Sequence, residues 1–199
     1  MQKTAIISAV LIGVVALGFW VWKHPVVDIQ SGVPITFDGL FETASSTNTE
    51  SVSAEPNAVL PETAFTHIYS EKVYGFSFGY PDGYSVKSTP NADGTGNTIL
   101  VQNDTTKKGV QILVTPYDDA DTTITAQKIA QDIPDMKVLN PQEVTIGTGK
   151  GLAFISDNGA FDGNSREVWF VFRKNLYQIS TYTAYDDFIR VLLGTWKFN

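Results

Sequence analysis

Beyond Phe65 the chain breaks into short apolar or alternating segments separated by turn residues, as in Tyr80-Pro81-Asp82-Gly83-Tyr84. Such segments predict β-strands, and most connections are too short for the crossover that joins parallel strands, so we expect a mainly antiparallel sheet. The predicted strands lie near residues 73–79, 84–87, 98–102, 110–115, 143–146, 152–156, 168–173 and 177–183.

Two helices complete the predicted pattern. Residues 124–133 place apolar side chains on one face and stop before Pro134, and residues 185–196 carry an apolar stripe that ends near Trp196. The predicted strands at 99–101 and 168–172 are apolar on both faces, and a strand of that kind must be covered on both sides. We therefore expect an α+β domain in which helices, or a helix and a folded segment, enclose the sheet.

An uncharged apolar run over residues 4–22 precedes the domain. A helix of that length spans roughly 28 Å, about one hydrocarbon core, so residues 1–23 are predicted to form a single transmembrane anchor. A cleaved signal peptide is the alternative, because Lys3 gives a short basic start, but the run exceeds the usual apolar region of about 7–15 residues. Lys3 favours a domain on the extracytoplasmic side of the cell membrane.

Residues 24–64 are predicted to form a flexible acidic tether. Residues 42–63 are rich in Ser, Thr, Glu and Pro and offer little apolar surface to bury. Residues 25–41 are more apolar, and they add a strand to the domain or lie on the membrane surface. The tether contains no Lys or Arg, and its acidic residues are Asp28, Asp38, Glu42, Glu50, Glu55 and Glu62.

Charge and cysteine usage exclude several classes of function. Beyond Ala64 the chain has 12 basic and 15 acidic residues, so no basic surface for the phosphates of a nucleic acid is predicted. The absence of cysteine removes disulfides, thiolate catalysis and cysteine metal sites together.

A serine hydrolase motif occurs at Gly75-Phe76-Ser77-Phe78-Gly79, which fits G-x-S-x-G. A nucleophile elbow needs a strand, a sharp turn at the serine and a helix, with the acid and the histidine later in the chain. Ser77 instead lies within an unbroken alternation, and the two histidines, His24 and His67, both precede it. We expect residues 73–79 to form a strand whose small side chains let another element approach closely.

Other motifs also favour structural interpretations. The sequence Gly-Thr-Gly-Lys-Gly at 147–151 lacks the remainder of a phosphate-binding loop, so a hairpin turn is expected. Calcium-binding spacing is absent both at the acidic cluster of the 118–121 loop and at the oxygen-rich 157–162 segment. The first is expected to be a helix entry and the second a polar hairpin loop. His67 alone makes no zinc site. The oxygen-bearing residues are Asp118, Asp119 and Asp121 in the first segment and Asp157, Asn158 and Asp162 in the second.

The stretch Val-Tyr-Gly-Phe-Ser-Phe-Gly-Tyr-Pro-Asp-Gly-Tyr at 73–84, with Phe-Ile-Arg-Val-Leu-Leu-Gly-Thr-Trp-Lys-Phe at 188–198, resembles the PsbP-like family over residues 65–199. Its best-known member is an extrinsic lumenal subunit of photosystem II. The resemblance implies an αβα sandwich on a mainly antiparallel sheet. It transfers no catalytic, cofactor-binding or metal-ligating residue, and the predicted anchor departs from the soluble photosynthetic members.

Because that family consists mostly of accessory and assembly proteins, the resemblance implies a non-catalytic binding or assembly module with a protein partner. Two alternatives stay open: a metal-dependent enzyme that uses the loop from Asp118 to Asp121, and a structural component of the cell envelope. Fold alone does not choose among these functions.

Overall fold

The computed structural model describes residues 64–199, which form ten β-strands and two α-helices. The predicted anchor at 1–23 and all of the predicted tether except Ala64 lie outside these residues. Within residues 64–199 no helix has the length and apolar character needed to cross a bilayer. The strands are β1 (His67–Glu71), β2 (Phe76–Tyr80), β3 (Tyr84–Pro90), β4 (Asn97–Asn103), β5 (Gly109–Pro116), β6 (Leu139–Ile146), β7 (Gly149–Ser156), β8 (Ser165–Phe172), β9 (Asn175–Tyr182) and β10 (Lys197–Phe198).

The strands form two antiparallel sheets. The large sheet has seven strands in the order β3-β4-β5-β9-β8-β7-β6, and the small sheet has three in the order β1-β2-β10. Every pairing in both sheets is antiparallel, which confirms that prediction. The turn after β2 is also confirmed, and Gly83 adopts a φ of +75° there, a conformation that suits glycine.

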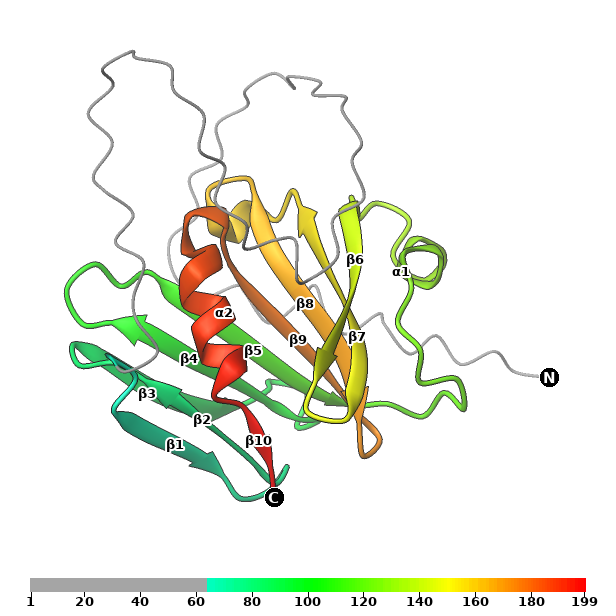
Figure 1. Cartoon of the computed structure of the whole chain (residues 1–199). Coiled ribbons are helices and arrows are strands. Elements are labelled where there is room, and N and C mark those ends of the chain that lie inside the picture. The colour runs from blue at the N-terminus through cyan, green and yellow to red at the C-terminus, as the bar shows by residue number, and fades with distance from the viewer. Residues whose placement is uncertain (1–63) are drawn as a thin grey trace, which may run out of the picture.

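One face of the large sheet is covered by α2 (Asp186–Gly194) together with the small sheet (Figure 1). Alternate residues of β4, β5, β8 and β9 point into this layer, where they meet Phe76 and Phe78 of β2 and Leu192 of α2. The strands supply β-branched and aromatic residues at every second position, so one side of each strand becomes continuous apolar surface.

The opposite face carries a second apolar cluster beneath α1 (Ala126–Asp132) and the loop that precedes it. Ile129 of α1 packs there with Phe154 and Trp169, whose rings meet edge to face at 5.4 Å. The cover on this face reaches β7, β8 and β9, as the doubly apolar strand at 168–172 predicts. It includes no residue of β4, where Leu100 is only half-buried, so the same prediction for 99–101 was wrong.

Several boundaries differ from the prediction. The strand expected at 73–79 begins only at Phe76, because residues 72–75 form a turn in which Gly75 has a φ of +65°. Helix α1 is shorter than predicted and begins after Thr125, whose hydroxyl accepts a hydrogen bond from the Lys128 backbone N–H. The small-sheet strands β1 and β10 were not predicted. These strands have only five and two residues, too few to show a clear strand pattern in the sequence.

Candidate functional site at the edge of β1

Ser77 lies in the middle strand of the small sheet, paired with Ser70 of β1 and Lys197 of β10. The next element after β2 is a turn and then strand β3. A nucleophile elbow requires a helix at that point, so the structural interpretation of this motif is supported. The close approach expected on this strand occurs at Gly79, where an added Cβ would lie 3.3 Å from atoms of both Phe65 and Thr195.

The glycine-rich segment 147–151 is a tight turn between β6 and β7, because Ile146 pairs with Gly149 across it. Gly147 has a φ of +59°, which a glycine adopts at little cost. The prediction of a hairpin turn is confirmed here.

The acidic loop at 118–121 is not a helix entry, and that prediction was wrong: α1 has no acidic residue in its first turn. Two of the acidic side chains of this loop instead bind within the loop or pair with Lys128 of α1. Asp119 accepts a hydrogen bond from the Lys128 ammonium, which holds the pKa of Asp119 below its ordinary value. Asp121 accepts from the backbone N–H of Thr123 at 3.0 Å, which lowers its pKa as well. Asp118 makes no ion pair within the described residues.

The second oxygen-rich segment is the polar loop between β7 and β8, as predicted. Asp157 pairs with Lys137 at 3.1 Å and Asp162 with Lys108 at 3.0 Å, while Asn158 caps a short 3-10 turn at Gly159–Phe161. Within residues 64–199 no three His, Cys, Asp or Glu side chains are grouped to hold a metal ion. The metal-dependent alternative at the 118–121 loop therefore lacks a ligand cluster.

A buried carboxyl group that sequence reasoning missed lies at Glu167 of β8, which is 1% exposed. Its oxygens accept hydrogen bonds from the hydroxyls of Ser165 and Ser180, each at 2.5 Å, and from the indole N–H of Trp169 at 3.2 Å. Burial raises the pKa of Glu167, and these donors oppose the rise. Glu167 follows two polar residues, Ser165 and Arg166, at the start of the strand, so the sequence gives no sign of this burial.

The Glu167 cluster is closed to substrates. Beside it lies Gln178 of β9, which is 3% exposed and whose amide has no hydrogen-bond partner. A carboxyl with a raised pKa is a common feature of active sites, but a group this deeply buried cannot touch a substrate in the described conformation. We therefore assign Glu167 a structural role within the large sheet, where it accepts hydrogen bonds from neighbouring side chains.

The edges of the two sheets differ in how well they are protected. An open strand edge offers unpaired N–H and C=O groups to other chains, and Lys, Pro or a bulge usually blocks this. β3 carries Lys87 and Pro90, and β6 carries Pro141 at a register shift. β10 is only two residues long.

β1 has none of these protective features. Its five residues pair with β2 in unbroken register and include neither Pro nor Lys. Ile68 stands on its outer face and is 74% exposed. β1 is thus the edge, within residues 64–199, best suited to accept another extended segment.

The inner face of β1 is firmly held. The Tyr69 hydroxyl donates to the buried carboxylate of Glu71 at 2.7 Å, and the Val73 backbone N–H donates to the same carboxylate at 3.1 Å. Burial, together with this hydrogen bond, raises the pKa of Tyr69 to about 12. His67 stacks on Tyr80 with ring centroids 5.2 Å apart. The strand is thereby fixed in an extended conformation before any partner arrives.

Comparison with known proteins gives a structural likeness but no sequence match. No protein-family model matches the chain, and no curated protein does. The structure is similar to the solution structure of cyanobacterial PsbP (CyanoP) from Synechocystis sp. PCC 6803, at 12% sequence identity and a TM-score of 0.45, over 68% of this chain and 94% of that one. At this TM-score and identity the likeness supports no conclusion about family or function.

Proposed function

We propose that this protein is a non-catalytic binding module, held at the extracytoplasmic face of the cell membrane, that captures an extended segment of a protein partner along β1. The observation that carries the proposal is the open edge of β1, with Ile68 exposed beside it. Main-chain hydrogen bonds give such strand addition its affinity, and side chains beside the edge give it specificity.

The residues along the β1 edge indicate which kind of partner segment would bind there. A strand added to β1 places one of its side chains next to Ile68 on the outer face, where an apolar residue removes the most surface from water. The partner should therefore offer an extended segment, free of proline at its centre, with an apolar side chain at that position.

Attachment to the membrane comes from the apolar run at 4–22, with residues 24–64 as the tether. A tether of that length has a typical span of roughly 35 Å. It keeps the domain close to partners in the same membrane and so raises their effective concentration.

A photo-crosslinking pair tests the edge directly. The amino acid p-benzoylphenylalanine is placed at Ser70, an exposed residue of β1, in the full chain in its native membranes. We expect a crosslinked partner protein, and we expect Ile68→Lys to abolish that crosslink because a charge at the edge discourages strand addition. Leu139→Lys is the matched control, since Leu139 is also a large apolar residue, 49% exposed, on the edge strand β6.

Two results would contradict the proposal. A crosslink that survives Ile68→Lys does not depend on the β1 edge. A crosslink to a second copy of this chain would favour the role of a structural component of the envelope, because self-association would then be the purpose of the edge.

A further inference from the structure

Chain segments from distant parts of the sequence meet at one end of the domain. The Asn199 backbone N–H donates to the Gly75 carbonyl at 2.9 Å, which ties the C-terminus to the β1–β2 turn. Arg173, in the β8–β9 turn, donates to the Asn199 main-chain oxygen at 2.6 Å. The Phe198 ring stacks on Phe172 at 3.7 Å. The β1–β2 turn, the β8–β9 turn and the C-terminal strand therefore form one continuous surface.

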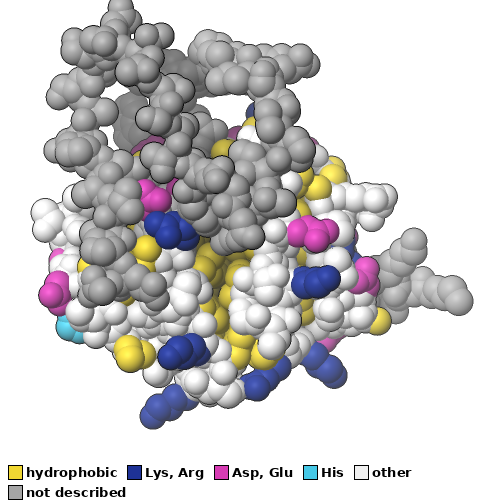
Figure 2. All heavy atoms as spheres, viewed as in Figure 1, with side chains coloured by type: hydrophobic (Ala, Val, Ile, Leu, Met, Phe, Trp, Pro, Cys, Tyr) yellow, Lys and Arg dark blue, Asp and Glu magenta, His cyan; other side chains and the backbone are white. Residues whose placement is uncertain are grey.

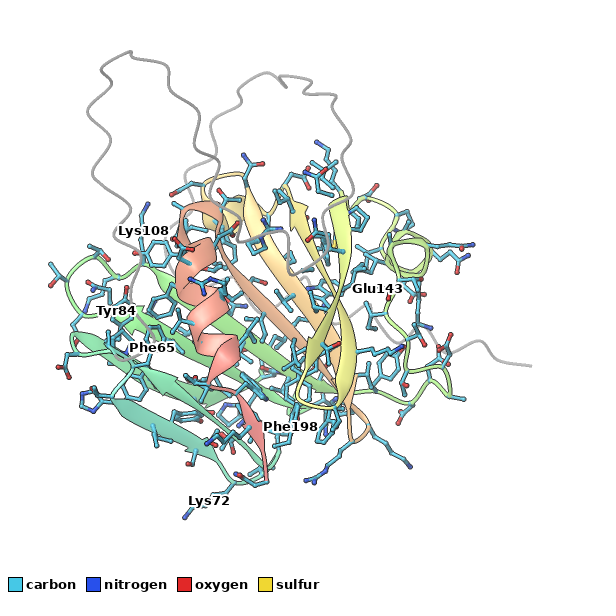
Figure 3. The ribbon with its side chains drawn as sticks, viewed as in Figure 1. Phe65, Lys72, Tyr84, Lys108, Glu143 and Phe198 are labelled. Carbon is cyan, nitrogen blue, oxygen red and sulfur yellow. The ribbon has the colours of Figure 1, made fainter. Side chains whose placement is uncertain are left out.

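The β6–β7 turn joins the same surface, because an added Cβ at Gly147 would lie 3.1 Å from the Phe198 ring. We call this surface the basic end. Figure 2 shows Lys and Arg side chains along the lower border of the domain, and Figure 3 places Lys72 there. The basic end is defined by five exposed side chains, Lys72, Lys150, Arg173, Lys174 and Lys197.

Lys72, Lys150, Lys174 and Lys197 have no ion-pair partner among residues 64–199, whereas Arg173 is held by the main-chain oxygen of Asn199. Elsewhere in the domain most basic side chains are paired with a carboxylate: Lys108, Lys128, Lys137, Arg166 and Arg190. Two acidic residues lie close to the basic end. One is Glu71, which is buried. The other is Asp118, which directly follows Tyr117, and the Tyr117 backbone N–H donates to the Lys174 carbonyl in the β8–β9 turn. The basic end therefore carries a net positive charge, although the chain as a whole is acidic.

An exposed apolar side chain stands among these cations. Val73, in the β1–β2 turn next to Lys72, is 79% exposed, and the neighbouring Tyr74 is half-buried. Unpaired cations around a protruding apolar side chain are the combination that favours a membrane interface, where the cations meet anionic headgroups and the apolar group leaves water.

We infer that the basic end docks on the surface of a bilayer that contains anionic lipid, with Val73 at the headgroup level. The inference rests on the proposed membrane attachment, which keeps the domain within reach of the bilayer. Because it is negatively charged, the acidic tether is a competing occupant of the basic end. Its polar Ser and Thr residues offer no apolar surroundings for Val73, whereas a membrane interface does. Docked in this way, the domain would keep Ile68, at the other end of β1, away from the lipid.

Because the chain contains no cysteine, a single introduced cysteine is the only thiol that a fluorophore can label. The full chain carrying Val73→Cys is labelled with the fluorophore NBD and reconstituted into vesicles of phosphatidylcholine alone or mixed with phosphatidylglycerol. In the mixed vesicles we expect a blue shift of the emission and quenching by nitroxide-bearing lipid, both lost at high salt, where the Debye length falls to about 3 Å. Ile68→Cys is the matched label, because its side chain is 74% exposed, and it should respond in neither vesicle.

Charge reversal supplies the second arm. Lys174→Glu combined with Lys197→Glu should remove the blue shift, whereas Lys87→Glu, at an exposed cation on β3 without an ion pair in the described residues, should leave it unchanged. Equal emission in the two vesicle types would overturn the inference. If that equal emission changes when residues 42–63 are deleted, the tether is the occupant of the basic end. Extraction of the chain with alkaline carbonate reports membrane insertion separately, so a failed anchor and a failed docking surface are distinguishable.

Discussion

The rings of Phe76 and Trp196 lie face to face, with centroids 4.4 Å apart and planes inclined by 10°. Phe76 belongs to the small sheet, and Trp196 follows the end of α2. The same indole meets Phe170 of the large sheet edge to face at 6.0 Å. One side chain from the C-terminal segment therefore joins both sheets and closes the core between them.

Replacing Trp196 by alanine should destabilise the domain strongly. The side chain is 5% exposed, and truncation of a buried aromatic residue to alanine costs about 3–5 kcal/mol. Urea unfolding of the full chain in detergent, followed by circular dichroism, measures the loss. Trp196→Phe keeps the stacking on Phe76 and should lose much less. A loss below about 1 kcal/mol for the alanine variant would show that the ring is not a core residue.

Gly79→Ala tests the close approach on β2. The new methyl group would lie 3.3 Å from atoms of Phe65 and Thr195, so one of these neighbours has to shift. Overpacking of this kind costs typically about 1–3 kcal/mol. Gly194→Ala is the control, because nothing lies within 4 Å of its Cβ position at the end of α2. It should be neutral or stabilise the helix by up to about 1 kcal/mol, and equal losses at both positions would contradict the role given to Gly79.

The large sheet and both helices were predictable because their residues follow simple periods. β4 and most of β5 bury every second residue, β8 and β9 are buried at nearly every position, and the stripe of α2 from Phe188 to Leu192 faces the core. The prediction failed where a local conformation interrupts the period. The sequence predicts one strand over residues 73–79, yet Gly75 turns the chain with a positive φ, so Val73 protrudes into solvent instead.

The candidate surfaces were less predictable than the elements. Whether β1 is an edge depends on the order of strands in the small sheet, which places β2 between β1 and the C-terminal β10. The basic end combines side chains from residue 72 to residue 197, brought together by contacts of Asn199 and Phe198. Neither relationship exists within any short window of sequence. The net charge beyond Ala64 is negative, so the prediction of no basic surface missed this local excess of cations.

Ser77→Ala should leave any hydrolytic activity of the preparation unchanged. Ser77 lies between two paired strands, with no helix after it and no His among its paired residues. Labelling with a fluorophosphonate probe and mass spectrometry of the tryptic peptide give the measurement. Detection of the probe on Ser77 would contradict the structural interpretation.

Glu167 should make the stability of the domain fall as the pH rises. Burial raises the pKa of this carboxyl above the ordinary 4.5, so the folded state holds the proton more tightly than the unfolded state. Between 4.5 and the raised pKa the folded state binds more protons, and the free energy of unfolding therefore decreases with increasing pH. Glu167→Gln does not titrate at this position. The stability of the parent chain minus that of Glu167→Gln should be greater at mildly acidic pH than at neutral pH.

A second variant separates this effect from the titration of other groups. The Ser180 hydroxyl donates to Glu167 and opposes the rise of its pKa. Ser180→Ala removes that donor, so the pKa of Glu167 should rise further and the decline in stability should extend to higher pH. Urea unfolding of the three proteins across the same pH series gives the comparison. Parallel curves for the parent chain and Glu167→Gln would show that Glu167 binds the same number of protons in the folded and unfolded states. Its pKa would then be the same in both states, which would contradict the prediction.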